Sequence, residues 1–144
     1  RNIVKERTQK PIETTNELVE IVKRSKPNKE LKKPGHPAKQ VFQALRIAVN
    51  DELNVLRKVI SQALEALKSG GRLAIITFHS GEDRIVKEAF KKATTIQGNR
   101  LNIPTNTEET EYVLVNKKPI TATEDELKTN HRSSSAKLRI IERK

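Results

Sequence analysis

A histidine and a serine stand side by side in the stretch TFHSGEDR, which runs from Thr77 to Arg84 directly after an apolar run. Such a pair could serve as a base and its nucleophile, could bind a ligand, or could form the turn into a helix. Neighbouring side chains on an extended strand point to opposite faces, and the G-x-S-x-G pattern of many hydrolases is absent here. The hydrolase therefore stays only as an alternative, which a serine-directed covalent probe would test.

Ser80 also has a structural explanation, because Asp83 follows it at the spacing of a capping box. In that motif the serine oxygen accepts a backbone N–H and the carboxylate reaches back to the start of the helix. We therefore expect Ser80 to begin a helix. His79 would then lie at the mouth of a strand, where an imidazole can donate to a phosphate, a base or a carbonyl. A substrate-facing role and a structural role are both compatible with that position.

Polar residues also follow one edge of a long helical segment. Lys39, Gln43, Arg46 and Asn50 are spaced four, three and four apart. At about 100° per residue they lie within about 60° of one another, beside the apolar stripe. Arg46 and Asn50 are thus candidates for holding a ligand, and the alternative is an ordinary solvated helix flank.

A third polar stretch, NHRSSSAKLR, lies near the end of the chain at residues 130–139. It places Arg132, Lys137 and Arg139 among three serines, and arginine forks and hydroxyl groups suit phosphate oxygens. The alternative is a plain loop. Histidines at 36, 79 and 131 lack carboxylate or thiolate partners at ligand spacing, so we expect no metal site. The glycine pair at 70–71 precedes a strand, whereas a phosphate-binding G-x-G-x-x-G must follow one.

The elements that position these residues are predicted from periodicity. Apolar residues recur every three or four positions over 38–68, which predicts helix, with a break expected near Asn50 and Asp51. Two earlier helices are expected, over 1–9 and after a cap at Thr14 or Thr15. The remaining predictions are an extended linker over 26–39, strands over 73–78, 112–115 and 136–142, helical segments over 85–90 and 123–128, and a surface loop over 94–111. This order indicates an α/β sheet.

The charge distribution favours a polyanionic partner. The chain has 29 Lys and Arg against 18 Asp and Glu, a formal charge of +11. Residues 1–40 hold 11 basic and 5 acidic residues, and residues 91–144 hold 11 basic and 7 acidic residues. Residues 41–90 are nearly neutral, with 7 basic and 6 acidic residues. Basic ends suit nucleic acid phosphates, and a generally lysine-rich surface is the alternative. Cysteine is absent and no apolar stretch approaches the roughly 20 residues of a membrane span, so we expect a cytoplasmic protein without a membrane partner.

Four blocks of the sequence carry a family resemblance. They are HPAKQVFQALRIAVNDEL, GGRLAIITFHSGEDRIVK, KPITATEDEL and NHRSSSAKLR, in this order. In order and spacing they resemble the bacterial 16S rRNA cytosine-N4 methyltransferase family (RsmH/MraW), and the resemblance covers the whole chain. It implies the C-terminal portion of such an enzyme.

The resemblance implies the fold and the domains. Residues 38–144 would form the C-terminal half of a class I, Rossmann-like methyltransferase sheet, and residues 1–37 the end of a helical substrate-recognition insertion and a linker. The strand over 136–142 would run antiparallel between the strands over 73–78 and 112–115. The cofactor would be S-adenosyl-L-methionine, whose site lies mostly in an N-terminal half that these residues do not include.

The resemblance also implies the function. The complete enzyme would methylate the N4 amine of a cytidine in 16S rRNA, with the small ribosomal subunit as partner, and this chain alone would be inactive. No catalytic residue can be assigned, and the oligomeric state, a dimer included, stays open. The RNA-facing residues are expected to be His36, Arg46, Asn50, His79, Ser80, Arg84, Arg132, Ser133 and Lys137. A free-standing basic RNA-binding module without catalysis is the alternative function.

Overall fold

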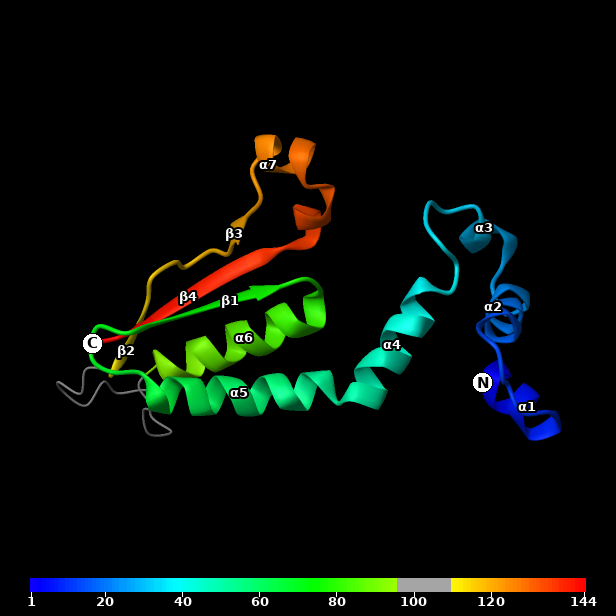
Figure 1. Cartoon of the computed structure of the whole chain (residues 1–144), viewed down its shortest axis with the longest axis horizontal. Coiled ribbons are helices and arrows are strands. Elements are labelled where there is room, and N and C mark those ends of the chain that lie inside the picture. Colours follow the sequence, from blue (N-terminus) through cyan, green and yellow to red (C-terminus); the bar gives the residue numbers. More distant parts are fainter. Residues whose placement is uncertain (96–109) are drawn as a thin grey trace, which may run out of the picture. The chain divides into compact units, whose positions relative to one another are not determined.

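The computed structural model describes residues 1–95 and 110–144 (Figure 1). The chain divides into two compact units, Arg1–Glu52 and Leu53–Lys144, which we call the N-terminal unit and the C-terminal unit. The domain boundary expected at 37/38 concerns a complete enzyme and stays a prediction. No helix in the described ranges is both long and apolar enough to cross a membrane.

The N-terminal unit is helical. Its elements are α1 (Asn2–Gln9), α2 (Thr15–Arg24), α3 (Asn28–Leu31) and α4 (Lys39–Asn50). The apolar stripe of α2 packs against the start of α4 and the segment before α2, and this contact forms a small core. The buried members are Leu18, Val22 and Ala38, and the half-buried ones are Ile3, Ile12, Val19, Val41 and Phe42.

A capping box begins α2. The hydroxyl of Thr14 accepts the backbone N–H of Glu17 at 3.2 Å, and the Glu17 carboxylate accepts the N–H of Thr14 at 3.1 Å. This confirms Thr14, one of the two expected caps. The backbone N–H of Glu13, the ammonium of Lys10 and the N–H of Thr14 together lower the pKa of Glu17 to about 2. The carboxylate therefore stays ionised, as its capping role requires.

The expectation of an extended linker over 26–39 is wrong at one point, because this segment contains the short helix α3. Pro27 precedes α3 with φ −67°, and its carbonyl accepts the N–H groups of Glu30 and Leu31. Proline fixes a φ close to the helical value and has no N–H to leave unpaired, so it suits a helix start.

The break expected near Asn50 and Asp51 is confirmed. Asp51 adopts a left-handed conformation with φ 51° and ends α4, and α5 (Glu52–Ala66) begins at the next residue. Aspartate tolerates this conformation better than most residues because its short side chain bonds locally. The predicted helix over 38–68 is therefore two helices.

The C-terminal unit combines helices with a sheet. After α5 come β1 (Arg72–Thr77), α6 (Ser80–Ala93), β2 (Tyr112–Leu114), β3 (Ile120–Thr121), α7 (Glu124–Thr129), the 3₁₀ helix η1 (His131–Ser135) and β4 (Lys137–Arg143). The three predicted strands are confirmed within one residue at each end. The two-residue strand β3 was not predicted, because it is too short to show periodicity. The loop predicted over 94–111 lies outside the described residues except at its two ends.

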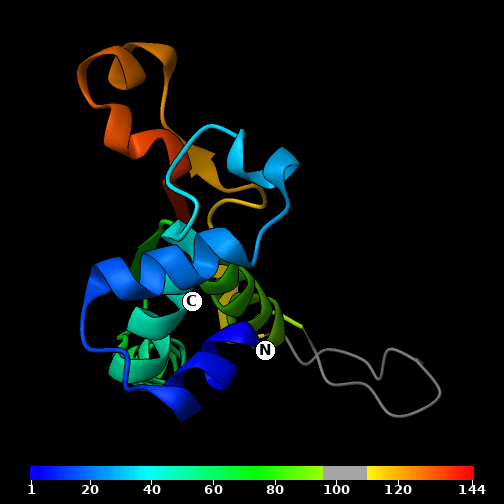
Figure 2. The same cartoon turned by 90° about the vertical axis from the view of Figure 1, so that its right-hand side faces the viewer.

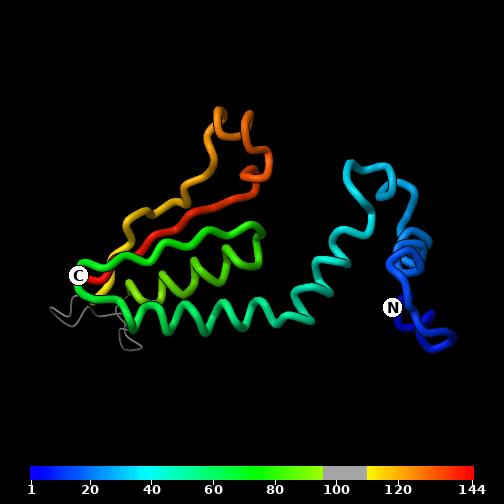
Figure 3. The backbone as a smooth tube through the Cα atoms, in the orientation of Figure 1, coloured from blue at the N-terminus to red at the C-terminus, as the bar shows by residue number. Residues whose placement is uncertain are grey.

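The last strand lies inside the sheet. β4 pairs antiparallel with β1, from Arg72 opposite Glu142 to Thr77 opposite Lys137. Its other edge pairs antiparallel first with β2 and then with β3. The tube in Figure 3 shows β4 running between these neighbours. The strand order β1-β4-β2 is the order that the family resemblance implies.

Helices cover one face of the sheet. Ile60 of α5, Phe90 of α6 and Ile141 of β4 are almost completely buried and form one core with Ile85 and Val86. α5 and α6 lie on the same side of β1 and β4 (Figure 1). This layer fixes where the carboxyl end of β1 meets the first turn of α6.

The opposite sheet face is apolar and exposed. Ile76 and Ile120 both face Leu138 across β4, and opposed residues share one face of a sheet. The exposed fraction is 56% for Ile76, 51% for Ile120 and 41% for Val113. β1 is also an edge strand, because β4 is its only strand partner within the described residues. An uncovered apolar face beside an unpaired edge normally marks a surface that another element covers.

Candidate nucleic-acid interface

The junction between β1 and α6 is held by His79, which caps the helix. Its Nδ1 accepts the backbone N–H groups of Gly81 at 3.2 Å and Glu82 at 3.3 Å. In return, Oε2 of Glu82 accepts the N–H groups of Phe78 at 2.9 Å and His79 at 3.3 Å. The expected box of Ser80 and Asp83 is therefore wrong. The extended backbone of His79, with φ −142° and ψ 161°, directs its ring over the first turn and makes it the cap.

This geometry fixes the tautomer of His79. Because Nδ1 accepts two N–H groups, the proton of the neutral ring resides on Nε2. Nε2 is buried and lies 3.2 Å from Oε1 of Glu82, without a hydrogen bond. Neither nitrogen can take a proton from Ser80, so the hydrolase alternative loses its support. Glu82 is also a carboxylate neighbour of His79 that the spacing analysis missed.

Replacing His79 by alanine is expected to lower the free energy of unfolding of the C-terminal unit by about 1 kcal/mol, because the cap is lost. His79→Asn should restore most of that loss, since Oδ1 of asparagine occupies nearly the place of Nδ1 and is a preferred cap. Urea unfolding of the two variants measures both effects. Equal losses in both variants would contradict a capping role.

Asp83 faces β4 instead of the helix start. Its carboxylate receives two hydrogen bonds from Arg139, at 2.8 Å from Nε and 3.3 Å from Nη2, and Nζ of Lys137 lies 3.5 Å away. The exposed fractions of the Asp83 and Arg139 side chains are only 14% and 11%. The hydrogen bond from Arg139 holds the pKa of Asp83 below its ordinary value, against a desolvation that raises it. This pair ties α6 to the last strand.

The other C-terminal residues expected to face RNA divide into exposed and buried ones. Ser80, Arg84 and Arg132 are exposed, and Lys137 is half-buried beside Asp83. Ser133 has only 4% of its surface exposed, and its hydroxyl donates to the carbonyl of Asn130 at 2.7 Å. Its side chain therefore stabilises η1 and is not presented to a ligand. In both Figure 1 and Figure 2, α7 and η1 stand off the end of the sheet.

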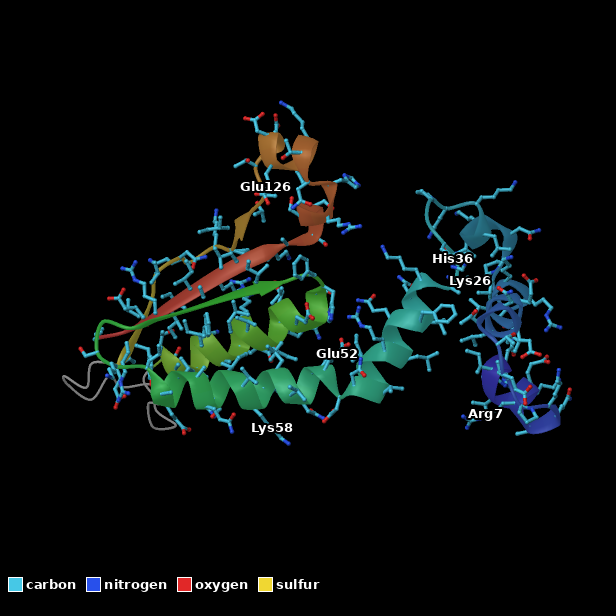
Figure 4. All side chains as sticks on the ribbon, viewed as in Figure 1. Arg7, Lys26, His36, Glu52, Lys58 and Glu126 are labelled. Carbon is cyan, nitrogen blue, oxygen red and sulfur yellow. The ribbon has the colours of Figure 1, made fainter. Side chains whose placement is uncertain are left out.

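The remaining three expected residues belong to the N-terminal unit. His36 is exposed in the segment between α3 and α4 (Figure 4), and its Nδ1 accepts the N–H of Ala38 at 3.3 Å. Arg46 binds Glu52 through two hydrogen bonds of 2.8 and 3.0 Å, and Asn50 donates to the same carboxylate at 3.2 Å. Arg46 and Asn50 therefore lie close together, as their spacing predicted. Both bind the carboxylate of Glu52, which the sequence analysis did not single out.

The chain is a basic mixed α/β protein in which His79, Glu82 and Asp83 lie where β1 ends and α6 begins. The model of the MraW methylase family matches residues 1–144, and the chain belongs to this family.

Two curated relatives carry the same name. The chain is 51% identical over 145 residues to "Ribosomal RNA small subunit methyltransferase H" of Limosilactobacillus fermentum (strain NBRC 3956 / LMG 18251). It is 49% identical over 145 residues to the protein of that name from Oenococcus oeni (strain ATCC BAA-331 / PSU-1). In both alignments 99% of this chain covers 46% of the relative, so the chain spans about half the length of the curated relatives it matches.

Proposed function

We propose that this chain is part of an S-adenosylmethionine-dependent methyltransferase that modifies the N4 amine of a cytidine in 16S rRNA. The observation that carries the proposal is the family match over residues 1–144, together with relatives named for methylation of small-subunit rRNA. Because the chain spans about half of those relatives, the activity belongs to the longer protein. The chain alone is expected to be inactive.

The uncovered sheet surface supports the proposal that this chain is one part of a longer protein. The free edge of β1 and the apolar face around Ile76 suit pairing with further strands and cover by further helices. We infer that residues 38–144 contribute one half of a larger, Rossmann-like sheet and that the rest of the protein supplies the other half. Residues 1–37 then belong to a helical insertion that contacts the substrate.

One pocket of the C-terminal unit, formed by described residues of α5 and α6, does not fit S-adenosylmethionine. It has a volume of about 370 Å³ and is bordered by Arg57 and Lys92, and no carboxylate lines it. A cofactor with a positively charged sulfonium is favoured by acidic groups, whereas the charged residues of this pocket are Arg57 and Lys92. This supports our proposal that the cofactor site lies mostly in the other half of the protein.

The role left to this chain is to bind and orient RNA. The lone pair of the cytidine amine is delocalised into the ring, so the amine is a weak nucleophile and its alignment matters more than a strong base. An RNA base that undergoes chemistry is usually unstacked and held by contacts to the flanking sugar-phosphate backbone. Arg84, Arg132 and Lys137 can supply such backbone contacts. Arg84 lies in α6, which begins directly after His79, and Lys137 lies opposite Thr77 at the end of β1.

The experiment that tests the proposal is methyl transfer from labelled S-adenosylmethionine to small-subunit rRNA by the complete protein. We expect transfer by the complete protein, none by this chain, and no cofactor binding to this chain in calorimetry. Micromolar cofactor affinity of the chain, or no transfer by the complete protein to free rRNA or to the small subunit, would contradict the proposal. The alternative of an RNA-binding module predicts salt-sensitive RNA affinity and no transfer even when the remaining half is supplied.

The variant His79→Asn separates a structural role of this histidine from an RNA-facing one. Because asparagine preserves the helix cap, unchanged transfer by this variant would assign His79 to capping alone. A fall in transfer with restored stability would place the imidazole at the RNA.

A further inference from the structure

A small basic pocket lies beside α6, and none of the expected RNA-facing residues lines it. It has a volume of about 130 Å³, with Phe90 and Leu114 as apolar wall. The turn that follows β2 borders it on one side and α6 on the other. Its other lining residues are Lys87, Lys91, Asn116, Lys117 and Arg139.

Three lysines surround this pocket. Lys87 and Lys91 are four residues apart on α6 and therefore lie on one side of the helix, while Lys117 approaches from the turn after β2. All three are exposed, and within residues 1–95 and 110–144 none of them forms an ion pair with a carboxylate. Like charges gathered without counter-charge repel one another, so an anion bound among them would be stabilised.

The inner wall of the pocket is fixed by hydrogen bonds. The Asn116 amide donates to the carbonyls of Lys118 at 2.7 Å and Leu138 at 3.1 Å and accepts the N–H of Ile140 at 2.7 Å. These bonds tie the turn that carries Lys117 to β4. The pocket therefore needs little rearrangement on binding, which lowers the entropic cost.

Arg139 adds donors at the same place. Asp83 takes two of the five N–H donors of a guanidinium and balances its charge. Only 11% of the Arg139 side chain is exposed, but its Nη1 has no hydrogen-bond partner among the described residues and is not completely buried, so it can donate to a ligand in the pocket that Arg139 lines.

The size and charge of the pocket select the ligand. A volume of about 130 Å³ is well below the roughly 300–1,000 Å³ of small-molecule sites, so a nucleoside or a cofactor does not fit. A phosphate group does fit, and lysines on flexible stems suit a backbone phosphate. Arg84 precedes Lys87 by about one helical turn, so Arg84, Lys87 and Lys91 form a row of cations along α6. Such a row can face successive backbone phosphates of one RNA strand.

We propose that the pocket formed by Lys87, Lys91, Lys117 and Arg139 binds a backbone phosphate of the substrate RNA. This site rests on the proposed function and deepens it, because it places an RNA contact on the flank of α6. The contact is to the backbone, so it contributes affinity and orientation without reading the sequence.

The test compares two triple variants of the complete protein that remove the same charge. One is Lys87→Gln/Lys91→Gln/Lys117→Gln. The matched control is Lys58→Gln/Lys68→Gln/Lys92→Gln, three exposed lysines outside this pocket. Lys58 points away from α6 and the sheet (Figure 4), and Lys92 lies on the same helix as Lys87 and Lys91. Binding of a single-stranded RNA is measured against salt concentration.

We expect the pocket variant to reduce the magnitude of the slope of log K against log salt by about 0.7, the contribution of one phosphate contact on a single strand, and to weaken the binding of unrelated RNAs equally. The control should leave the slope unchanged. Equal changes in both variants would mean a general charge effect and would overturn the proposal. Saturation of the wild-type pocket by millimolar inorganic phosphate, with RNA binding unaffected, would assign it to a small anion and overturn it as well.

Methyl transfer measured in parallel keeps the two proposals apart. We expect the pocket variant to raise the KM for RNA and to leave kcat nearly unchanged. If the wild-type protein transfers no methyl group but the slopes differ, the proposed function fails and the phosphate site stands. If methyl transfer is normal and the pocket variant has the same salt slope as the control variant, only the proposal of a phosphate site fails.

Discussion

Replacing Phe90 by alanine is expected to lower the free energy of unfolding of the C-terminal unit by about 3–5 kcal/mol. Phe90 has 1% of its surface exposed and packs among Ile60, Ile85 and Ile141, so the truncation leaves a cavity between α6 and the sheet. The free energy of unfolding of a single domain is only about 5–15 kcal/mol, so the substitution is expected to remove a large part of it. Urea unfolding followed through Tyr112, the one tyrosine of a chain without tryptophan, measures the change.

Phe78→Ala is the matched control, because it removes the same side chain from the uncovered face. Phe78 has 56% of its surface exposed, so we expect a change of at most about 1 kcal/mol in this chain. In the complete protein the same substitution should cost more, if the remaining half covers this face as proposed. A small effect of Phe90→Ala, or equal effects of the two substitutions in this chain, would contradict the described core.

The second large effect is expected from the ion pair between α6 and β4. Asp83→Asn should lower the free energy of unfolding by about 2–3 kcal/mol, because it leaves the guanidinium of Arg139 mostly buried without its counter-charge. The double variant Asp83→Asn/Arg139→Met should lose less than the sum of the single variants, since it removes both charges together. The exposed pair of Lys128 and Asp125 provides the control, and Asp125→Asn should change stability by less than about 0.5 kcal/mol.

The stabilisation by Asp83 should depend on pH in a defined direction. Its pKa is lowered in the folded state from an ordinary value of 3.8, with the hydrogen bond from Arg139 as the largest cause. The contribution is therefore complete above about pH 4 and is lost as the pH falls through the lower folded pKa. Unfolding experiments across this acidic range should show that loss in the wild-type chain and not in Asp83→Asn. Additive losses in the double variant, or parallel pH profiles, would contradict the pairing.

The sequence by itself determined most of the secondary structure and its order, with the short elements α3, β3 and η1 as the exceptions. The periodicity over 38–68, the turn residues at 70–71 and the alternation over 136–142 each follow from local geometry, and the helices and strands lie within a few residues of the predicted positions. The family also follows from the sequence, because its four blocks span the chain and the family model matches residues 1–144. The basic ends follow from composition alone, and the order of the strands in the sheet was implied by the family resemblance.

Only the tertiary structure decided what individual polar side chains do. Ser80 and Asp83 have the spacing of a capping box, yet His79 and Glu82 form it, because the backbone at the end of β1 directs the imidazole over the first turn. Asp83 is drawn instead to Arg139, 56 residues away in sequence, and Ser133 turns inward to Asn130. Lys117 reaches the α6 lysines only because Asn116 ties its turn to β4. Local spacing limits which partners a side chain can reach along one element, whereas pairing across the sheet depends on register and packing, which a single sequence does not display.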